Sequence, residues 1–287
     1  MRDHRIEFGS ISKGCEVIGL SRSSFYYRKQ GCATRLTDQE LRDRIERIQE
    51  EFSSYGYRRV DEQLRKSGVV VNGKRIRRVM REHGLYPIAW KRSVKTTESR
   101  NGLKGYPNLL KNLTVDGLNQ VWVADITYIA IRDGFVYLAA MLDLFSRRVV
   151  GWALSRRLDR ELCLVALRMA LSQRQGVAGC IHHSDRGVQY ASRDYIALLE
   201  QNHLRISCAK GSHENTHMES FNKTLKYEEV HLWNYETFRD VLDRIPYFLE
   251  AVYNRKRLHS SIGYRSPEEF EAAFTQKTIA DLPVLKL

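Results

Sequence analysis

The segment VWVADITYIAI at residues 121–131 places an aspartate inside an otherwise apolar strand, and no other feature constrains the fold as much. Both faces of such a strand carry mostly apolar side chains, which is typical of a central strand covered by helices on both sides. Burying an uncompensated carboxylate costs several kcal/mol. Asp125 must therefore be paired, protonated or bound to a metal ion.

The residues that follow predict a mixed α/β layer. Asp133 and Gly134 form a hairpin turn before a second apolar strand, FVYLAAMLDLF, and RRVVGWALS reads as a third. RELCLVALRMALSQ and SRDYIALLEQN have helical periodicity, GCIHHSD and RISCA read as short strands, and HMESFNKTLKYEEV closes the series as a helix. This order predicts an α/β fold, ribonuclease-H-like by analogy, with a mixed five-stranded sheet and flanking helices.

The positive charge of the chain is concentrated in its first part. The whole sequence has 47 Lys and Arg against 34 Asp and Glu; residues 1–110 contain 24 against 13, and the remaining 177 contain 23 against 21. A basic front joined to a nearly neutral body indicates one part that binds a polyanion and another that acts on it. We therefore expect nucleic acid as the partner.

Nothing in the sequence suggests a membrane or secreted protein. The longest apolar run, residues 135–142, is far shorter than the roughly 20 residues of a membrane helix. The first ten residues, MRDHRIEFGS, lack the apolar region of a secretory signal. The five cysteines are scattered, with no C-x-x-C pair, as expected for reduced thiols. We expect a cytoplasmic protein associated with the nucleoid.

Two basic helical regions precede the strands. In the first, Gly19 marks a turn between two short helices, and the second helix would bring Arg22 and Arg28 to DNA. In the second, Asn72 caps a helix whose apolar stripe is Ile76, Val79 and Met80. Its cations, expected to contact DNA unless the helix is merely solvated, are Lys74, Arg75, Arg77, Arg78 and Arg81. The predicted domains are a helix-turn-helix-like segment (1–35), a basic helix-turn-helix DNA-binding domain (36–86), a linker (87–118), a catalytic core (119–275) and a tail (276–287).

Two further carboxylates can join Asp125. Asp185 follows the short strand GCIHHS, and Glu219 lies on the last helix of the series. Carboxylate oxygens with open positions between them suit Mg²⁺, with Mn²⁺ as a substitute. Two such ions can activate a nucleophile and stabilise the leaving oxygen of a phosphodiester. The bare pattern is weak evidence because the chain has 34 acidic residues, and each of the three could instead be structural.

Four motifs in order, WVADITYI, HHSDRGVQYAS, MESFNKTLKYEE and YNRKRLHSSIGYRSPEEF, resemble the catalytic core of DDE transposases. The chain is most similar to the second-frame (OrfB-type) transposases of bacterial insertion sequences of family three, which share the retroviral-integrase core fold. The resemblance implies that Asp125, Asp185 and Glu219 form the catalytic and metal-binding triad. The 33 residues between Asp185 and Glu219 are fewer than is usual in the family, and Glu214 is the alternative third carboxylate.

The expected function is a Mg²⁺-dependent DNA transposase with two ions per site. It would bind the terminal repeats of its element, free a 3′-hydroxyl, and join that hydroxyl to another phosphodiester without a covalent protein–DNA intermediate. Lys223 and Lys226, near Glu219, are expected to contact DNA phosphates. The expected partners are double-stranded terminal-repeat and target DNA, further copies of the chain as a dimer or larger assembly, and the product of an upstream reading frame. The rivals are a ribonuclease-H-like nuclease that only hydrolyses, and a DNA-binding regulator with an inactive core.

Several other polar residues have bland interpretations. His213 and His217 are four apart but lack an evident third metal ligand, so loop histidines are favoured. Packing or hydrogen bonding is expected of His182 and His183, and a structural ion pair between Asp143 and Arg147. One group matches a family motif without a role that its chemistry suggests: Tyr253, Asn254, Arg257 and His259.

Overall fold

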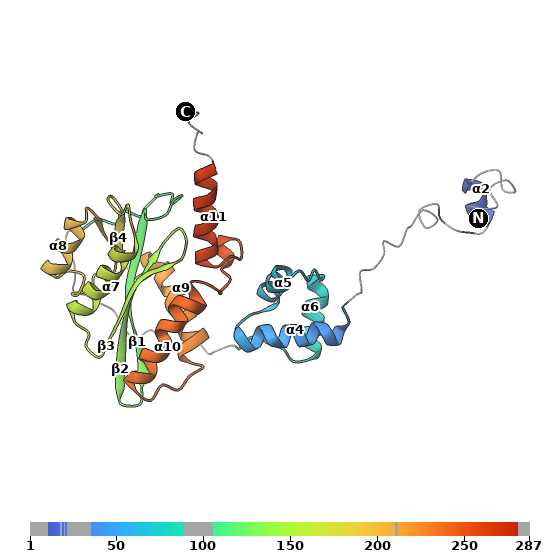
Figure 1. The fold of residues 1–287 in the computed structure, drawn as a ribbon, viewed down its shortest axis with the longest axis horizontal. Helices are drawn as coiled ribbons and strands as arrows, with labels where there is room; N and C mark the ends of the chain where they lie inside the picture. Colours follow the sequence, from blue (N-terminus) through green and yellow to red (C-terminus); the bar gives the residue numbers. More distant parts are fainter. Residues whose placement is uncertain are drawn as a thin grey trace. The chain divides into compact units, whose positions relative to one another are not determined.

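The computed structural model describes residues 11–17, 19, 21, 36–88, 106–209 and 212–280 (Figure 1). The chain divides into two compact units, residues 1–44 and 45–287. In the first unit, helix α2 (Ile11–Val17) is followed by Gly19 with a φ of 65°, a left-handed conformation that suits the expected turn. Arg22 and Arg28 lie outside the described residues, so their expected role in DNA binding stays a prediction.

Three helices follow: α4 (Asp38–Glu51), α5 (Tyr57–Lys66) and α6 (Gly73–Glu82). The side chain of Asn72 accepts a hydrogen bond of 2.8 Å from the backbone N–H of Lys74, which confirms the predicted cap of α6. The predicted apolar stripe is also confirmed, because Ile76, Val79 and Met80 are buried. The cations of α6 therefore lie on the other faces of the helix.

The five strands form one sheet in the order β3-β2-β1-β4-β5. Their bounds are β1 (Val121–Ile131), β2 (Gly134–Asp143), β3 (Val149–Ser155), β4 (Ile181–Ser184) and β5 (Arg205–Cys208). The pairs β1–β2 and β2–β3 are antiparallel, whereas β1–β4 and β4–β5 are parallel. The predicted mixed five-stranded sheet, with the aspartate-bearing strand at its centre, is confirmed.

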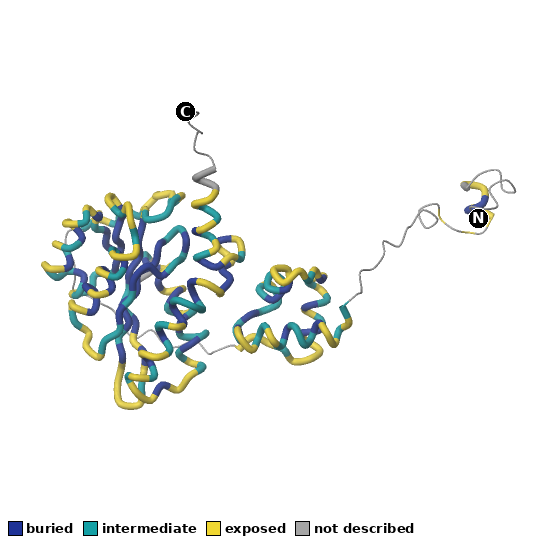
Figure 2. Tube along the Cα trace, viewed as in Figure 1, coloured by how far each residue is buried: buried dark blue, intermediate teal, exposed yellow. Residues whose placement is uncertain are grey.

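Helices cover both faces of this sheet (Figure 1). On one face, α7 (Arg160–Gln173) and α8 (Arg193–Gln201) pack on a core that includes Trp122. The other face packs against α9 (Thr216–Leu225) and α10 (Phe238–Tyr247). Figure 2 shows the buried residues gathered along the strands between these layers.

One close approach holds the first layer in place. A Cβ on Gly151 of β3 would stand 2.3 Å from the backbone oxygen of Ala166 on α7, so only glycine lets this helix pack so near the sheet.

Beyond α9 the chain leaves regular α-helical geometry twice. Residues Lys226–Val230 and Phe248–Tyr253 are π-helical, and the second of these segments begins two residues after Pro246. Proline has no backbone N–H to donate, so the hydrogen-bonding pattern of the helix must change near it. A 3-10 turn, Ser260–Ile262, and helix α11 (Pro267–Ala280) follow. Within the described residues, no helix has both the length and the apolar character needed to cross a bilayer.

Candidate active site

Asp125 lies on β1, and Asp185 directly follows β4, the parallel strand beside it. Val123 of β1 pairs with His183 of β4, and each aspartate lies two residues further along its own chain. Side chains two residues apart point to the same face of a sheet, so the register directs both carboxylates to the side that α9 covers. Both residues are half-buried. The backbone N–H of Gly187 donates to Oδ1 of Asp185 at 2.9 Å.

The electrostatics of Asp125 indicate that its negative charge lacks compensation. Burial, and then the charge of Asp185, raise the pKa of Asp125 to about 7 against two opposing hydrogen bonds, and Glu219 adds a smaller upward contribution. Burial also raises the pKa of Asp185. No ion pair among the described residues involves these two aspartates, so a bound cation would relieve the strain that their proximity creates.

Helix α9 supplies the remaining groups. Nδ2 of Asn222 donates to Oδ2 of Asp125 at 2.7 Å and so orients that carboxylate. Glu219 lies in the first turn of the helix with its side chain exposed. Directly after this helix, the ammonium of Lys226 lies 4.5 Å from the ring centre of Tyr128 on β1.

The donor chemistry of this site fits a hard divalent cation. Mg²⁺ prefers carboxylate oxygens and retains several waters. Asp125 and Asp185 offer such oxygens close together. Because the pair is partly buried, water screens the repulsion between the two carboxylates poorly. In the described part of the chain, no three His, Cys, Asp or Glu side chains form a complete metal cluster. The structure thus brings the two aspartates together and leaves Glu219 nearby but outside a ligand cluster.

Glu214, the alternative carboxylate, is engaged elsewhere. It lies in the 3-10 turn Ser212–Asn215, and its carboxylate accepts a hydrogen bond of 2.8 Å from Nδ2 of Asn108. The next residue, Asn215, donates to the backbone oxygen of Ala124 at 3.0 Å and ties this turn to β1. Glu219 adds to the upward shift in the pKa of Asp125, whereas the carboxylate of Glu214 is bonded to Asn108, and the choice of Glu219 as third carboxylate stays a prediction.

The histidines beside Asp185 have structural partners. Nε2 of His182 lies 2.9 Å from the hydroxyl of Tyr195, and Nδ1 of His183 lies 2.8 Å from the hydroxyl of Ser207. Burial lowers the pKa of His182 to about 3, so this imidazole is neutral. These contacts confirm the expectation of packing and hydrogen bonding. His217 lies on α9, so the expectation of a loop histidine is wrong for this residue, and the side chain of His213 lies outside the described residues.

The expected ion pair between Asp143 and Arg147 is wrong. The oxygens of Asp143 accept backbone N–H groups, from Asn119 at 2.7 Å and from Phe145 at 2.9 Å. The guanidinium of Arg147 instead contacts Nδ1 of His217. Asp143 is structural, as predicted, but its partners are main-chain donors, which no charge pattern in the sequence reveals.

The family motif near the end of the chain has a structural role that sequence reasoning missed. Asn254 bonds both backbone groups of Val149 on β3, accepting from its N–H at 2.9 Å and donating to its oxygen at 3.0 Å. Arg257 makes two hydrogen bonds to Glu228, at 2.7 and 2.8 Å. The motif therefore joins the last helices to the sheet, and its spacing was the only signal in the sequence.

Comparisons with known families agree with this architecture. A profile described as "Integrase core domain" matches residues 116–212, a second profile with the same description matches residues 204–267, and an "HTH-like domain" profile matches residues 37–93. The domain boundaries predicted from the sequence stay predictions.

Relatives extend over nearly the whole chain. The transposase InsF of insertion sequence IS3A from Escherichia coli K12 is 36% identical over 93% of this chain and 96% of its own length. A 31 kDa protein of insertion element IS600 from Shigella sonnei is 36% identical over 91% of this chain and 98% of its own length. Among solved structures, the HTLV-2 integrase catalytic core in complex with magnesium aligns with 53% of this chain and 95% of its own, at 15% identity and a TM-score of 0.41. Because the identity to InsF spans both the basic helices and the core, this chain belongs to the integrase-core transposases of IS3-type insertion sequences.

Proposed function

We propose that this transposase cuts DNA at the ends of its element and joins the freed 3′-hydroxyl to target DNA, with Asp125, Asp185 and Glu219 holding two Mg²⁺ ions. The observation that carries the proposal is the register of β1 and β4, which brings Asp125 and Asp185 so close that the charge of Asp185, after burial, raises the pKa of Asp125. Bound there, the metal ions would supply nucleophile activation and stabilisation of the leaving oxygen. Glu219 would complete the ligand set by a change of side-chain rotamer from its exposed position.

The residues around the aspartates have separate tasks in this proposal. Asn222 holds the carboxylate of Asp125 in one orientation, and the N–H of Gly187 does the same for Asp185. Lys223 lies on the helix that carries Glu219, and Lys226 directly follows that helix, so both would bind the phosphates on either side of the scissile bond. Both reactions displace an oxygen at phosphorus, so one site serves cleavage and joining without a covalent intermediate on the protein.

The joining reaction tests the proposal most directly. The purified chain is incubated with DNA carrying both flanks of its coding region, a plasmid target and either Mg²⁺, Mn²⁺ or EDTA. We expect 3′-end cleavage and strand-transfer products with either metal and none with EDTA, as well as assemblies of two or more copies on paired ends. Cleavage without any joined product would favour the purely hydrolytic nuclease. Binding without either product, with the upstream-frame product also present, would favour the regulator.

The cations of α6 are proposed to contact the terminal repeats. Lys74, Arg77 and Arg81 are exposed on this helix, opposite its buried stripe. Replacing all three with alanine should weaken binding to terminal-repeat DNA and reduce the slope of log K against log salt by about 0.9 per lost phosphate contact. Fluorescence anisotropy over a salt series measures both quantities. An unchanged slope would remove α6 from the DNA interface, and the variant Arg239→Ala on α10 serves as a charge-loss control.

A further inference from the structure

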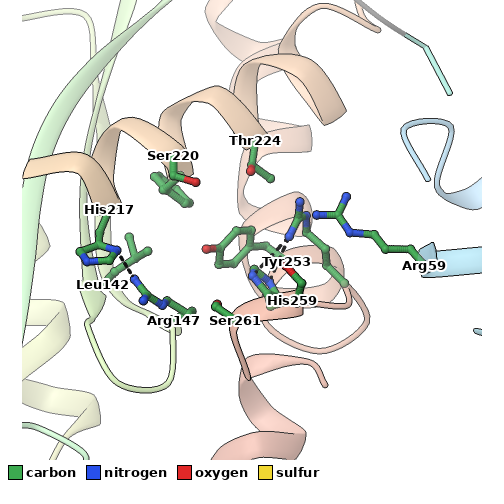
Figure 3. A pocket seen from close by; sticks show the side chains of 12 residues that line it. Arg59, Leu142, Arg147, His217, Ser220, Thr224, Tyr253, His259 and Ser261 are labelled. Atoms are coloured by element: carbon green, nitrogen blue, oxygen red, sulfur yellow. Dashed lines mark hydrogen bonds between the residues drawn. The ribbon is translucent and has the colours of Figure 1, made fainter. Parts of the chain in front are cut away.

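A cavity of about 310 Å³ lies beside α9 and takes no part in the chemistry proposed above. Four parts of the chain contribute to its lining: Arg59 of α5, the end of β2 with the turn after it, α9, and the segment from Tyr253 to Ser261 (Figure 3). The polar side chains that line it include Arg147, His217, Ser220, Thr224, Arg257 and His259. Their functional groups are guanidinium, imidazole and hydroxyl, which are donors to phosphate oxygens.

The lining of the cavity is cationic. It contains Arg59, Arg147 and Arg257 and no acidic residue. Glu228, outside the lining, is held by the guanidinium of Arg257 and lies 3.6 Å from that of Arg59. One negative charge thus faces two of the three cations. The cavity keeps an excess of positive charge that an anion can neutralise.

Arg147 is the cation with unused hydrogen-bonding capacity. Its Nε is buried and has no hydrogen-bond partner among the described residues, although another guanidinium nitrogen contacts His217. A buried donor without an acceptor is costly, and in native proteins it usually marks an absent ligand or water. Figure 3 shows the side chain of Arg147 extending toward His217 on α9.

The imidazoles of the cavity do not compete with this guanidinium for charge. Burial and the neighbouring arginines lower the pKa of His259 to about 2. His217 contacts the guanidinium of Arg147. The ring of His259 is neutral at physiological pH and contributes hydrogen bonds only, so the arginines of the lining carry the charge recognition.

The cavity and the aspartate pair lie on different sides of the same helix. His217, Ser220 and Thr224 follow each other at intervals of three and four, so they share one side of α9. Asn222, which bonds Asp125, lies on another side. A helix with its side chains is about 10–12 Å across, so one strand of DNA can pass over α9 and reach both places.

We propose that this cavity binds one unpaired nucleotide of the DNA substrate next to the cleavage position, with its phosphate on Arg147 and on the hydroxyls of Ser220 and Thr224. The proposal rests on the proposed function, because it assumes that DNA lies over α9. A volume of about 310 Å³ accommodates a single nucleotide and excludes a base pair in its duplex. The transposase would thereby hold open the strand end that its carboxylates process.

A comparison of binding to blunt and overhang DNA probes tests whether the cavity holds an unpaired nucleotide, and it needs no cleavage. The probes are a blunt duplex from the end of the element and the same duplex with a short single-stranded overhang, on the 5′ or the 3′ side. In EDTA, we expect the unchanged chain to bind one overhang probe about tenfold more tightly than the blunt duplex. Arg147→Ala should abolish this preference and leave blunt-duplex affinity unchanged. Arg168→Ala, which removes an exposed cation from α7, should keep it.

Two further measurements make the result decisive. Ser220→Asp, at an exposed position, puts a negative charge at the rim and should abolish the preference even if Arg147→Ala fails to fold. An excess of deoxynucleoside monophosphate should compete with the overhang probe and not with the blunt one. Equal binding of both probes by the unchanged chain overturns the proposal, and equal binding together with thermal stabilisation by the monophosphate assigns the cavity to free nucleotides. Loss of cleavage with a preserved overhang preference would instead count against the proposed function alone.

Discussion

An Asp125→Asn variant is expected to lose DNA cleavage and strand transfer by about 10³-fold or more. The amide keeps the shape of the side chain and can still accept the hydrogen bond from Asn222, but it removes the negative charge that a divalent cation needs. Removing that charge also relieves its repulsion with Asp185, so the metal-free variant should unfold at a temperature no lower than the unchanged protein. Gel assays of cleaved and joined DNA, with thermal unfolding measured in EDTA, check both parts.

The matched control is Asp133→Asn. Asp133 lies in the hairpin turn between β1 and β2, on the same sheet, and its side chain is 80% exposed beside Arg132. This substitution should leave both reactions unchanged. DNA affinity measured in EDTA should be retained by both variants, since neither substitution removes a cation that is proposed to contact DNA. Full activity of Asp125→Asn would remove Asp125 from the reaction and the metal site with it.

The second large effect is expected on stability, from Glu228→Gln. The side chain of Arg257 is 5% exposed, and both of its hydrogen bonds to Glu228 would face a neutral amide after the change. Removing one partner of a buried ion pair leaves the other charge without compensation, so we expect a loss of about 3 kcal/mol in the free energy of unfolding. Urea unfolding followed by circular dichroism measures it.

A surface pair provides the comparison. Glu268→Gln breaks the pair with Arg255, whose side chain is 64% exposed, and should cost about 0.5 kcal/mol or less. Similar losses in the free energy of unfolding from the two variants would show that the pair of Glu228 and Arg257 stabilises the protein no more than a surface pair does.

The pH dependence of the same pair has a definite sign. Burial raises the pKa of Glu228, but the charge and hydrogen bonds of Arg257 outweigh burial, so the pKa is lowered from its usual 4.5. A lowered carboxylate pKa adds stability above the unfolded value and loses it as pH falls through the folded value. The difference between the unchanged protein and Glu228→Gln should therefore shrink as pH falls below 4.5.

Local patterns predicted the elements of this fold well. The alternation around Asp125 indicated a central strand, and Asn72 before an apolar stripe indicated a capped helix; both are present. Periodicity and capping depend on residues a few positions apart, so the sequence carries them directly. The same reasoning singled out Asp125 and Asp185, since each follows or interrupts an apolar strand.

The contacts between distant segments were decided by tertiary structure. The bond between Asn222 and Asp125 joins residues 97 positions apart, and that between Asn254 and Val149 joins residues 105 apart. Asp143 shows what sequence reasoning could not predict. Its charge suggested an ion pair with Arg147, yet its oxygens accept hydrogen bonds from backbone N–H groups.

The sequence by itself thus determined a mixed sheet with a carboxylate at its centre and a basic helical front. Both can be predicted from residues near one another in the chain, because alternation indicates burial and composition gives the charge. Only the folded chain decided that Asp125 and Asp185 repel one another beside α9, and that Arg147 is left with a free donor in a cationic cavity. Both depend on which side chains from separate elements share the same space, and that is set by packing.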